Sequence, residues 1–326
     1  MGGIGALVLT YNRKHLLSRC LSAILTQSQP PDEVIVLDNG STDETREYLC
    51  SSSLLENGRI SAYRVEQNVG TAAGFDILFR IGYGRGFDWL WCMDDDVIAG
   101  REALKELKAA FAGNFSRSEE VGFLISVAVS GTGEPSNVPE VDLRAERLQC
   151  PSWADRLDGS LVKLRWATFN SILIPRSTLL RVGGLCPDFY FAGEDIDFTL
   201  RVTEVVPGYL VGKSKVTHLR EAGGIFSALT QSDPVRIRMA TSYYRNNVYL
   251  RRRYYSRVRM MLFIGKCGWE ALLALRAKTY RFKRAASILK GVLAGLWFVP
   301  RRPAINAPPA VPLINLTSVA HRGHAA

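Results

Sequence analysis

The sequence of 326 residues lacks the cysteine and histidine patterns that build zinc sites and disulfide frameworks. Its six cysteines are dispersed without any CxxC pair, and the chain has only four histidines. Neither a structural zinc site nor a disulfide scaffold is therefore predicted. Dispersed cysteines of this kind favour a reducing compartment, so we expect a cytoplasmic protein.

Long hydrophobic runs are also missing. No uninterrupted apolar segment reaches the roughly 18 residues that a membrane-spanning helix needs. Residues 1–6 (MGGIGA) lead directly into an apolar stretch, without the charged region and the cleavage site of a secretory signal. We therefore expect neither a spanning helix nor export.

Acidic residues are nearly absent from one part of the chain. The formal net charge is +10, and residues 236–302 contain 17 Lys and Arg but a single acid, Glu270. The 24 basic and 30 acidic residues elsewhere leave a charge of −6. Basic charge confined to one helical segment favours contact with an anionic membrane surface over binding of nucleic acid.

Short apolar strands alternate with amphipathic helices along the first part of the chain. Residues 4–10 and 33–38 have the profile of buried strands, and apolar residues at helical spacing over 16–25 lie between them. A β-α-β unit of this kind predicts a parallel sheet and an α/β fold. Further strands are predicted at 59–65, 87–93, 121–129 and 167–175, and further helices at 177–182 and 194–205.

Three consecutive carboxylates, Asp94, Asp95 and Asp96, follow an apolar strand. Strand alternation places Asp94 and Asp96 on one side and Asp95 on the other. Carboxylates so close repel one another, and a divalent cation shared with a substrate diphosphate would offset the repulsion. Open α/β sheets bind ligands beyond the carboxyl ends of their strands. We therefore expect Mn²⁺ or Mg²⁺ here, and a solvated acidic turn is the alternative.

A second acidic segment, with Glu194, Asp195 and Asp197, opens a predicted helix. Carboxylates at this position complement the helix dipole, which is a sufficient structural explanation by itself. Transfer of a group to a hydroxyl also needs a general base, and a carboxylate is a usual choice. An acidic site far in sequence from the triple aspartate meets that need.

Two further segments offer polar groups at the ends of predicted elements. Asp38 closes the second strand, where we expect it to face a nucleoside while residues 41–43 start a helix. Residues 67–75 (QNVGTAAGF) combine small side chains with a helix start, which suits close approach of a sugar or phosphate. Their spacing matches neither a Walker loop nor a dinucleotide fingerprint.

In their order and approximate spacing, these segments resemble glycosyltransferase family 2, whose members are inverting enzymes with the GT-A fold. The resemblance extends over residues 4 to about 220. It implies a GT-A-type, Rossmann-like, mostly parallel mixed sheet with flanking helices. The segments that carry it are residues 10–13 (TYNR), 38–43 (DNGSTD), 68–70 (NVG), 94–96 (DDD) and 193–195 (GED).

The resemblance also implies roles for individual residues. Asp94 and Asp96 would bind the metal, Asp195 would be the catalytic base, and Glu194 would orient Asp195 or bind the acceptor. The donor nucleotide would contact Thr10, Asn12, Arg13, Asp38, Asn68, Asp94 and Asp95.

Within the family, the triple aspartate, His218 and residues 243–247 (YYRNN) look most like bacterial galactofuranosyl- and rhamnosyltransferases. A histidine similarly placed completes the metal site of the galactofuranosyltransferases, which implies that His218 is a third metal ligand. The alternative is a packed or surface histidine. Residues 68–70 are followed by Thr71, Ala72 and Ala73. This loop is therefore less glycine-rich than the loop expected in an enzyme that uses a galactofuranose donor.

The acceptor wall of these enzymes corresponds to residues that precede the acidic helix. The resemblance therefore implies acceptor contacts for Trp166, Phe169 and Asn170, although core packing explains the aromatic residues equally well.

Three regions are expected along the chain. Residues 1–235 would form the catalytic domain, with the nucleotide-binding half at about 1–100 and the acceptor-binding half at about 101–235. Residues 236–302 would form a basic amphipathic helical extension, and residues 303–326, rich in Pro and Ala, a disordered tail. The extension would lie peripherally on the inner face of the cytoplasmic membrane, or else pack on the catalytic domain or in a homo-oligomer.

The sequence thus predicts an inverting, metal-dependent glycosyltransferase of bacterial cell-surface polysaccharide synthesis. The donor would be UDP-galactofuranose, or dTDP-rhamnose as the alternative, and the acceptor a hydroxyl of a lipid-linked or glycan molecule. A non-catalytic sugar-nucleotide or polyanion-binding protein is the alternative from another class. It is disfavoured because a polyanion binder gains nothing from clustered carboxylates.

Overall fold

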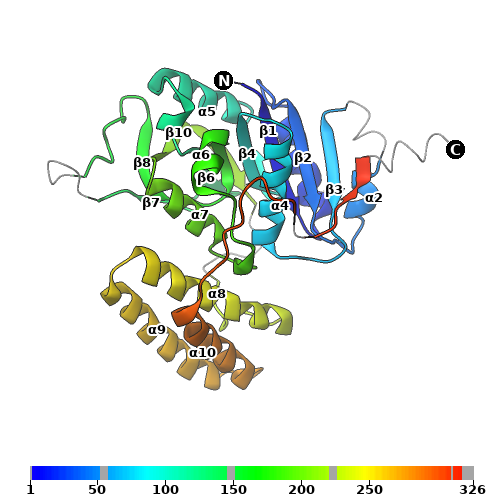
Figure 1. Ribbon diagram of the computed structural model, residues 1–326. Coiled ribbons are helices and arrows are strands. Elements are labelled where there is room, and N and C mark those ends of the chain that lie inside the picture. The colour runs from blue at the N-terminus through cyan, green and yellow to red at the C-terminus, as the bar shows by residue number, and fades with distance from the viewer. Residues whose placement is uncertain (1, 52–57, 145–150, 220–225, 310, 318–326) are drawn as a thin grey trace.

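The computed structural model describes residues 2–51, 58–144, 151–219, 226–309 and 311–317, and its strands form one mixed sheet flanked by helices (Figure 1). The strand order is β11-β3-β2-β1-β4-β9-β6-β10-β8-β7, and β5 pairs with β10. The first half comprises β1 Ile4–Thr10, α1 Lys14–Leu25, β2 Glu33–Asp38, α2 Thr45–Leu49, β3 Ile60–Arg64, α4 Thr71–Gly84, β4 Trp89–Asp94, β5 Val97–Ala99 and α5 Ala103–Asn114.

The four strands β3, β2, β1 and β4 are parallel, as the β-α-β pattern predicts. Thr10 lies in register with Asp38, and Leu9 lies in register with Asp94. The carboxyl ends of β1, β2 and β4 therefore meet at one edge of the sheet. This confirms the α/β class and brings together segments that are far apart in sequence.

The second half of the sheet mixes strand directions. β9 is antiparallel to both β4 and β6, whereas β10 is parallel to β6. β5 pairs antiparallel with β10 and sets His218 opposite Val97, next to Asp96. The elements are η1 Ser118–Glu120, β6 Phe123–Ser130, β7 Glu140–Val141, β8 Leu161–Trp166, β9 Asn170–Pro175, α6 Arg176–Val182, η2 Pro187–Phe189, α7 Glu194–Thr203 and β10 Gly208–His218.

Two apolar cores lie on the two faces of the sheet. Leu17, Leu21 and Leu104 belong to the core under α1 and α5. Phe79 and Phe198 belong to the opposite core, under α4 and α7. Strands that are buried on both faces are consequently apolar along their whole length, which explains their continuous hydrophobic runs.

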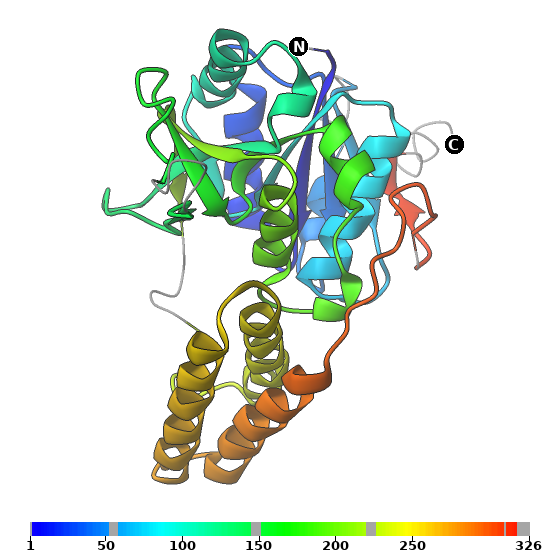
Figure 2. The same ribbon diagram turned by 60° about the vertical axis from the view of Figure 1, so that its left-hand side comes forward.

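The basic segment folds into a separate three-helix module, with α8 Pro234–Tyr254, α9 Arg257–Leu275 and α10 Arg281–Trp297 (Figures 1 and 2). Gly291 and Gly295 on α10 permit close packing, since a Cβ at either would lie 2.6 Å from a carbonyl oxygen of α8. A satellite cluster that includes Phe189, Leu200 and Tyr249 joins the module to the sheet domain. None of the helices in the described ranges is long and apolar enough to span a membrane.

The predicted disorder after residue 302 is wrong for the described part of that segment. After α10 the chain returns along the sheet domain (Figure 2), and the short strand β11, Ile314–Asn315, pairs antiparallel with β3. Arg80, buried on α4, donates to the carbonyl oxygens of Ala304 and Ala307. The composition of this segment alone suggested disorder. Hydrogen bonds from Arg80 and pairing with the edge strand β3 order it instead. Residues 318–326 lie outside the described residues.

Candidate active site

The triple aspartate lies at the carboxyl edge of the sheet. β4 ends at Asp94, so the alternation expected for a continuing strand stops there, and Asp95 and Asp96 form a turn. One guanidinium nitrogen of Arg13 contacts both, at 3.2 Å from Asp95 and 3.0 Å from Asp96. Asp95 also accepts a hydrogen bond of 2.7 Å from Thr10. The sequence predicts Asp95 and Asp96 on opposite sides of a strand. The structure corrects this, because the side chains of both contact the guanidinium of Arg13.

The electrostatics of the three carboxyls differ. Burial raises the pKa of Asp94 well above its ordinary value, and the charges of Asp96 and Asp95 raise it further. Burial also raises the pKa of Asp95 to about 6. Burial acts in the same sense on Asp96, but His218 and Arg13 outweigh it and lower the pKa of that carboxyl. Asp96 therefore carries the most stable negative charge of the three.

The structure brings two of the three predicted metal ligands together. His218 Nε2 lies 3.2 Å from Asp96 Oδ1, a buried oxygen with no well-aligned hydrogen bond in the described structure. His218 Nδ1 is 3.1 Å from the hydroxyl of Ser136, which fixes the ring and leaves Nε2 directed at Asp96. An under-bonded carboxylate oxygen beside an oriented imidazole fits a divalent cation.

The three predicted metal ligands do not form a ready-made cluster in the described structure. Among the described residues, no group of three His, Cys, Asp or Glu side chains is arranged around a common point that could hold an ion. Asp96 and His218 are the two predicted ligands whose side chains are in contact, and Asp94 stays a predicted ligand.

The predicted nucleoside contacts form a hydrogen-bonded frame between strand ends. Asn12, at a φ of 55°, accepts a 2.6 Å hydrogen bond from the backbone N–H of Thr42. Asp38 is fully buried, accepts from the N–H of Ser41 at 2.8 Å, and pairs with Arg64. Arg64 was not predicted, although it lies in register with Asp38 on the neighbouring strand, where a complementary charge is expected.

The loop at residues 68–70 contacts the second acidic segment directly. Asn68 accepts from the N–H of Gly70, which has a φ of 86°. A Cβ at Gly70 would lie 2.3 Å from the carbonyl oxygen of Tyr190, so only glycine fits. Thr71 donates to the carboxyl of Glu194. The loop at residues 68–70 and the start of α7 are therefore neighbours.

Glu194 and Asp195 lie in the first turn of α7, as predicted. Burial and the charge of Asp195 raise the pKa of Glu194 to about 8, and burial raises the pKa of Asp195 to about 6. Asp195 accepts a 2.7 Å hydrogen bond from the N–H of Ile196, and within the described ranges it forms no ion pair with Arg or Lys. At neutral pH the pair thus carries mainly one charge, on Asp195, in an environment that favours proton uptake.

The two acidic segments lie close enough to influence each other. The negative charge of Asp195 is one of the contributions that raise the pKa of Asp94, although burial contributes most. Asp94 and Asp195 each keep part of their surface exposed, although protein atoms surround most of each carboxyl. They are separated by 101 positions in the sequence, and the fold brings them to the same edge of the sheet.

The three predicted acceptor contacts have different surroundings. Trp166 is half-buried, donates to Glu140, and lines a pocket between the sheet domain and α8 with Ile196, Asn247 and Tyr255. Phe169 instead packs edge to face on Phe75 in the core, which corrects its predicted role. Asn170 is 2% exposed and donates to Thr168, so it too is withdrawn from the surface.

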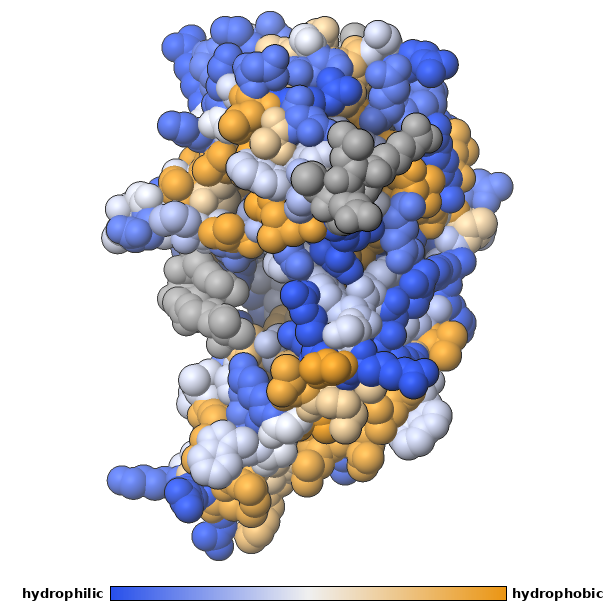
Figure 3. All heavy atoms as spheres, turned by 90° about the vertical axis from the view of Figure 1, so that its left-hand side faces the viewer, coloured by the Kyte–Doolittle hydropathy of each residue, from blue (hydrophilic) through white to orange (hydrophobic). Residues whose placement is uncertain are grey.

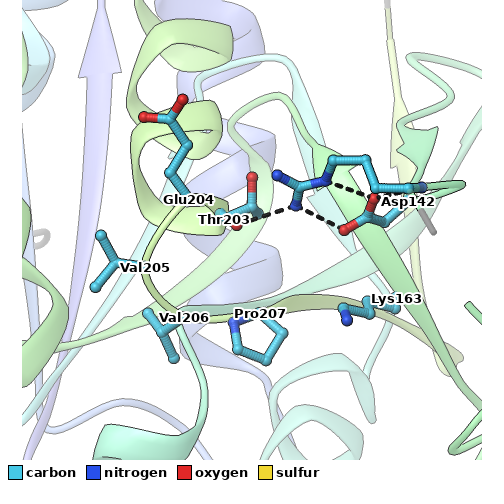
Figure 4. A pocket seen from close by; sticks show the side chains of 8 residues that line it. Asp142, Lys163, Thr203, Glu204, Val205, Val206 and Pro207 are labelled. Atoms are coloured by element: carbon cyan, nitrogen blue, oxygen red, sulfur yellow. Dashed lines mark hydrogen bonds and ion pairs between the residues drawn. The ribbon is translucent and has the colours of Figure 1, made fainter. Parts of the chain in front are cut away.

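A separate hollow lies at the other end of α7 (Figure 4). It is lined by Asp142, Arg144 and Lys163 together with residues 203–207. Arg144 donates twice to Asp142, at 2.7 and 2.8 Å, and also to the carbonyl oxygen of Thr203. The charges that line this hollow neutralise one another, so the candidate site remains at the start of α7.

Comparison with known proteins is consistent with this geometry. The family model "Glycosyl transferase family 2" matches residues 6–116. Galactofuranosyltransferase GlfT1 of Mycolicibacterium smegmatis is 34% identical over 91 residues, which are 28% of this chain and 29% of that protein. Its counterpart from Mycobacterium tuberculosis is 26% identical over 207 residues, 60% of this chain and 63% of that protein. The matches thus span less than two thirds of these relatives.

The fold has a counterpart among solved structures. The mannosyltransferase PcManGT of Pyrobaculum calidifontis, in complex with GDP-Man and Mn²⁺, superposes with a TM-score of 0.54 at 16% identity. The superposition covers 91% of this chain and 87% of that one. Over residues 6–116 the chain is similar to glycosyltransferase family 2, and its fold is of the GT-A type.

Proposed function

We propose that this chain transfers a sugar from a nucleotide-diphosphate donor to an acceptor hydroxyl, with inversion at the anomeric carbon. The observation that carries the proposal is the meeting of Asp94–Asp96 with Glu194 and Asp195 at one edge of the sheet. One acidic segment is paired with Arg13 and His218, and the other holds a carboxylate without a cationic partner among the described residues. This difference supports separate residues for binding of charge and for uptake of the proton.

The chemistry needs one displacement. The acceptor oxygen attacks the anomeric carbon, the bond from that carbon to the diphosphate oxygen breaks, and the nucleoside diphosphate leaves with the bonding electrons. Asp195 takes the hydroxyl proton, for which a pKa of about 6 is suitable. Glu194, with a pKa of about 8, stays largely protonated and does not add a second charge beside the base.

The donor side would bind the nucleotide through the strand-end loops. Thr10, Asn12, Asn68 and the buried Asp38 define that frame, and Arg13 holds Asp95 and Asp96 in place. Asp96 and His218 would hold Mn²⁺ or Mg²⁺. A divalent cation bound there supplies positive charge for the departing diphosphate.

We propose UDP-galactofuranose as the donor. The likeness to two proteins named as galactofuranosyltransferases supports that sugar, and the pairing of Asp96 with His218 agrees with the histidine expected in such enzymes. The acceptor would be a lipid-linked or glycan hydroxyl. It would enter through the pocket beside Trp166, because Ile196 in that pocket's wall directly follows Asp195.

The helical module would hold the enzyme on an anionic membrane surface on the cytoplasmic side. Figure 3 shows extensive hydrophobic surface where the module lies. On α9 the exposed apolar residues recur at helical spacing, and Trp269 is 59% exposed. On α10 and just beyond, Trp297 is 74% exposed and Val299 79% exposed. Apolar faces beside numerous Lys and Arg suit the interface of an anionic bilayer.

Vesicle sedimentation tests this attachment. The full chain should bind vesicles containing phosphatidylglycerol more strongly than phosphatidylcholine vesicles, and the double variant Trp269→Ser/Trp297→Ser should lose that binding. Leu180→Ser is the control, since Leu180 is 63% exposed on α6 of the catalytic domain. If wild type stays in solution and forms dimers instead, the face is a contact between copies and the attachment is wrong.

Thermal unfolding with a panel of nucleotide-sugars tests the proposed function itself. UDP-galactofuranose with Mn²⁺ should raise the melting temperature, because a ligand that binds only the folded state stabilises it. A shift with dTDP-rhamnose alone would retain the reaction and replace the sugar. With an acceptor present, release of free nucleoside diphosphate should follow. If no nucleotide-sugar shifts unfolding and no nucleoside diphosphate forms, the chain is a non-catalytic binding protein and the proposal fails.

A further inference from the structure

The segment before the catalytic base has an unfavourable backbone conformation. Tyr190 has a φ of 61°, Ala192 of 65° and Gly193 of 92°. L-residues rarely occupy positive φ, and such conformations persist only where surrounding structure imposes them. Gly193 is the residue immediately before α7, so the path of this segment determines where Glu194 and Asp195 begin.

A single side chain of the helical module holds this segment. The amide nitrogen of Asn246, on α8, donates to the carbonyl oxygens of Phe189 at 3.0 Å, Phe191 at 3.0 Å and Ala192 at 2.7 Å. Its two hydrogens serve three acceptors, so at least one hydrogen bond is shared. Asn246 is fully buried. Without this amide, the carbonyl groups of Phe191 and Ala192 would lose this partner, whereas that of Phe189 would keep a hydrogen bond from Arg245.

The same segment contacts the donor side. The carbonyl oxygen of Tyr190 accepts from the N–H of Ala72 at 3.5 Å and from the hydroxyl of Thr71 at 3.4 Å. It is also the atom that excludes a Cβ at Gly70. Residues 189–193 therefore lie between Asn246 on one side and the donor loop on the other.

The contact of Asn246 with residues 189–193 is called the clamp below. A neighbouring residue and a second contact reinforce it. Arg245 donates to the carbonyl oxygens of Asp188 at 2.6 Å and Phe189 at 3.1 Å. Further along α8, the hydroxyl of Tyr254 donates to buried Asp197, in the first turn of α7, at 2.8 Å. α8 thus contacts both the segment that leads into α7 and the beginning of the helix itself.

We propose that Asn246 is a positioning residue, which fixes residues 189–193 and through them the carboxylate of Asp195. The inference rests on the proposed function and gives residues 243–247 a physical role: the helical module completes the geometry of the base rather than merely anchoring the enzyme. Because Asn246 touches neither acidic side chain, its loss should affect turnover more than nucleotide binding.

The experiment compares Asn246→Ala and Asn246→Ser with wild type in the full chain. We expect kcat to fall about 100-fold in Asn246→Ala, as for a small misplacement of a reacting group, with an intermediate loss in Asn246→Ser, which keeps one donor. The Kd for UDP with Mn²⁺ should stay within about twofold of wild type. Amide hydrogen exchange should accelerate at residues 189–195.

Arg284→Gln is the matched control. Arg284 is buried in the same module and donates to the carbonyl oxygens of Ala228 and Leu229, away from the clamp. It should lower the melting temperature without the selective loss of kcat. If Arg284→Gln lowers kcat as much as Asn246→Ala does, or if Asn246→Ala keeps kcat and exchange rates, the inference is overturned. Absence of transfer by wild type would instead refute the proposed function, whereas the exchange comparison would still test the clamp.

Discussion

The two acidic segments at the edge of the sheet have opposite electrostatic surroundings. Asp96 lies between Arg13 and His218, and its pKa is lowered. Asp195 has a backbone N–H as its hydrogen-bond partner, and burial raises its pKa to about 6. A carboxylate beside a guanidinium and an imidazole suits permanent charge and ligand binding, whereas a buried one held by a single backbone N–H suits proton transfer. The contrast explains why one site needs two acidic segments.

The largest effect should come from removing the proposed base, Asp195. Asp195→Asn keeps the size of the side chain but cannot accept the acceptor proton, so transfer should fall on the order of 1000-fold. Initial rates of nucleoside diphosphate release with donor and acceptor measure it. Glu204→Gln is the control, because Glu204 directly follows α7 and its ion pair with Arg253 is exposed. Rates near wild type in Asp195→Asn would remove Asp195 from the role of base.

Removing the paired carboxylate should instead affect binding. Asp96→Ala deletes the oxygen beside His218 and leaves Arg13 with Asp95 alone. We expect the affinity for UDP in the presence of Mn²⁺ to fall about 100-fold, with a smaller change when Mn²⁺ is omitted. Isothermal titration in both buffers measures the difference. An equal loss with and without Mn²⁺ would show that Asp96 does not bind the ion.

A smaller effect should follow from the residue that orients the imidazole. Ser136→Ala removes the partner of His218 Nδ1, and loss of such an outer contact weakens metal binding about tenfold. Titration of Mn²⁺ by its electron paramagnetic resonance signal measures the affinity. Ser18→Ala, on α1, is the control because the Ser18 hydroxyl bonds only to the backbone of its own helix in the described structure. Equal affinities in wild type and Ser136→Ala would argue against His218 as a ligand.

The smallest effect is the pH dependence. Asp195 must be unprotonated to accept a proton, and burial raises its pKa to about 6. Turnover should therefore be half-maximal near pH 6, fall as the pH decreases below it, and be close to its maximum near pH 7, before Glu194 begins to lose its proton. A profile of kcat against pH checks this. A decrease in kcat centred near pH 4, the ordinary range of an exposed carboxyl, would contradict the buried environment of Asp195.

Local patterns predicted most of the fold and the acidic residues. The strands β1, β2 and β4 are continuous apolar runs, and the polar ends of β2 and β4 gave Asp38 and Asp94 without knowledge of the topology, whereas Thr10 followed from the resemblance. These signals can be recognised in each strand separately, because burial on both faces makes the whole strand apolar.

Long-range contacts account for what the sequence could not reveal. The core position of Phe169 depends on α4, and the order of residues 304–307 depends on Arg80, more than 220 positions away. The loop between residues 131 and 139 gave no signal that Ser136 meets His218. Asn246 belongs to a segment that stands out in the sequence by its basic charge. Its side chain, however, contacts neutral backbone carbonyl groups.

The central claim is that the two acidic segments perform separable tasks, and one paired titration tests it most directly. UDP with Mn²⁺ is titrated into Asp195→Asn and into Asp96→Ala, and transfer by each variant is measured on the same preparation. The account predicts that Asp195→Asn binds as tightly as wild type but does not turn over, whereas Asp96→Ala has lost most of its Mn²⁺-dependent binding. Equal loss of nucleotide binding in both variants would contradict the separation of tasks.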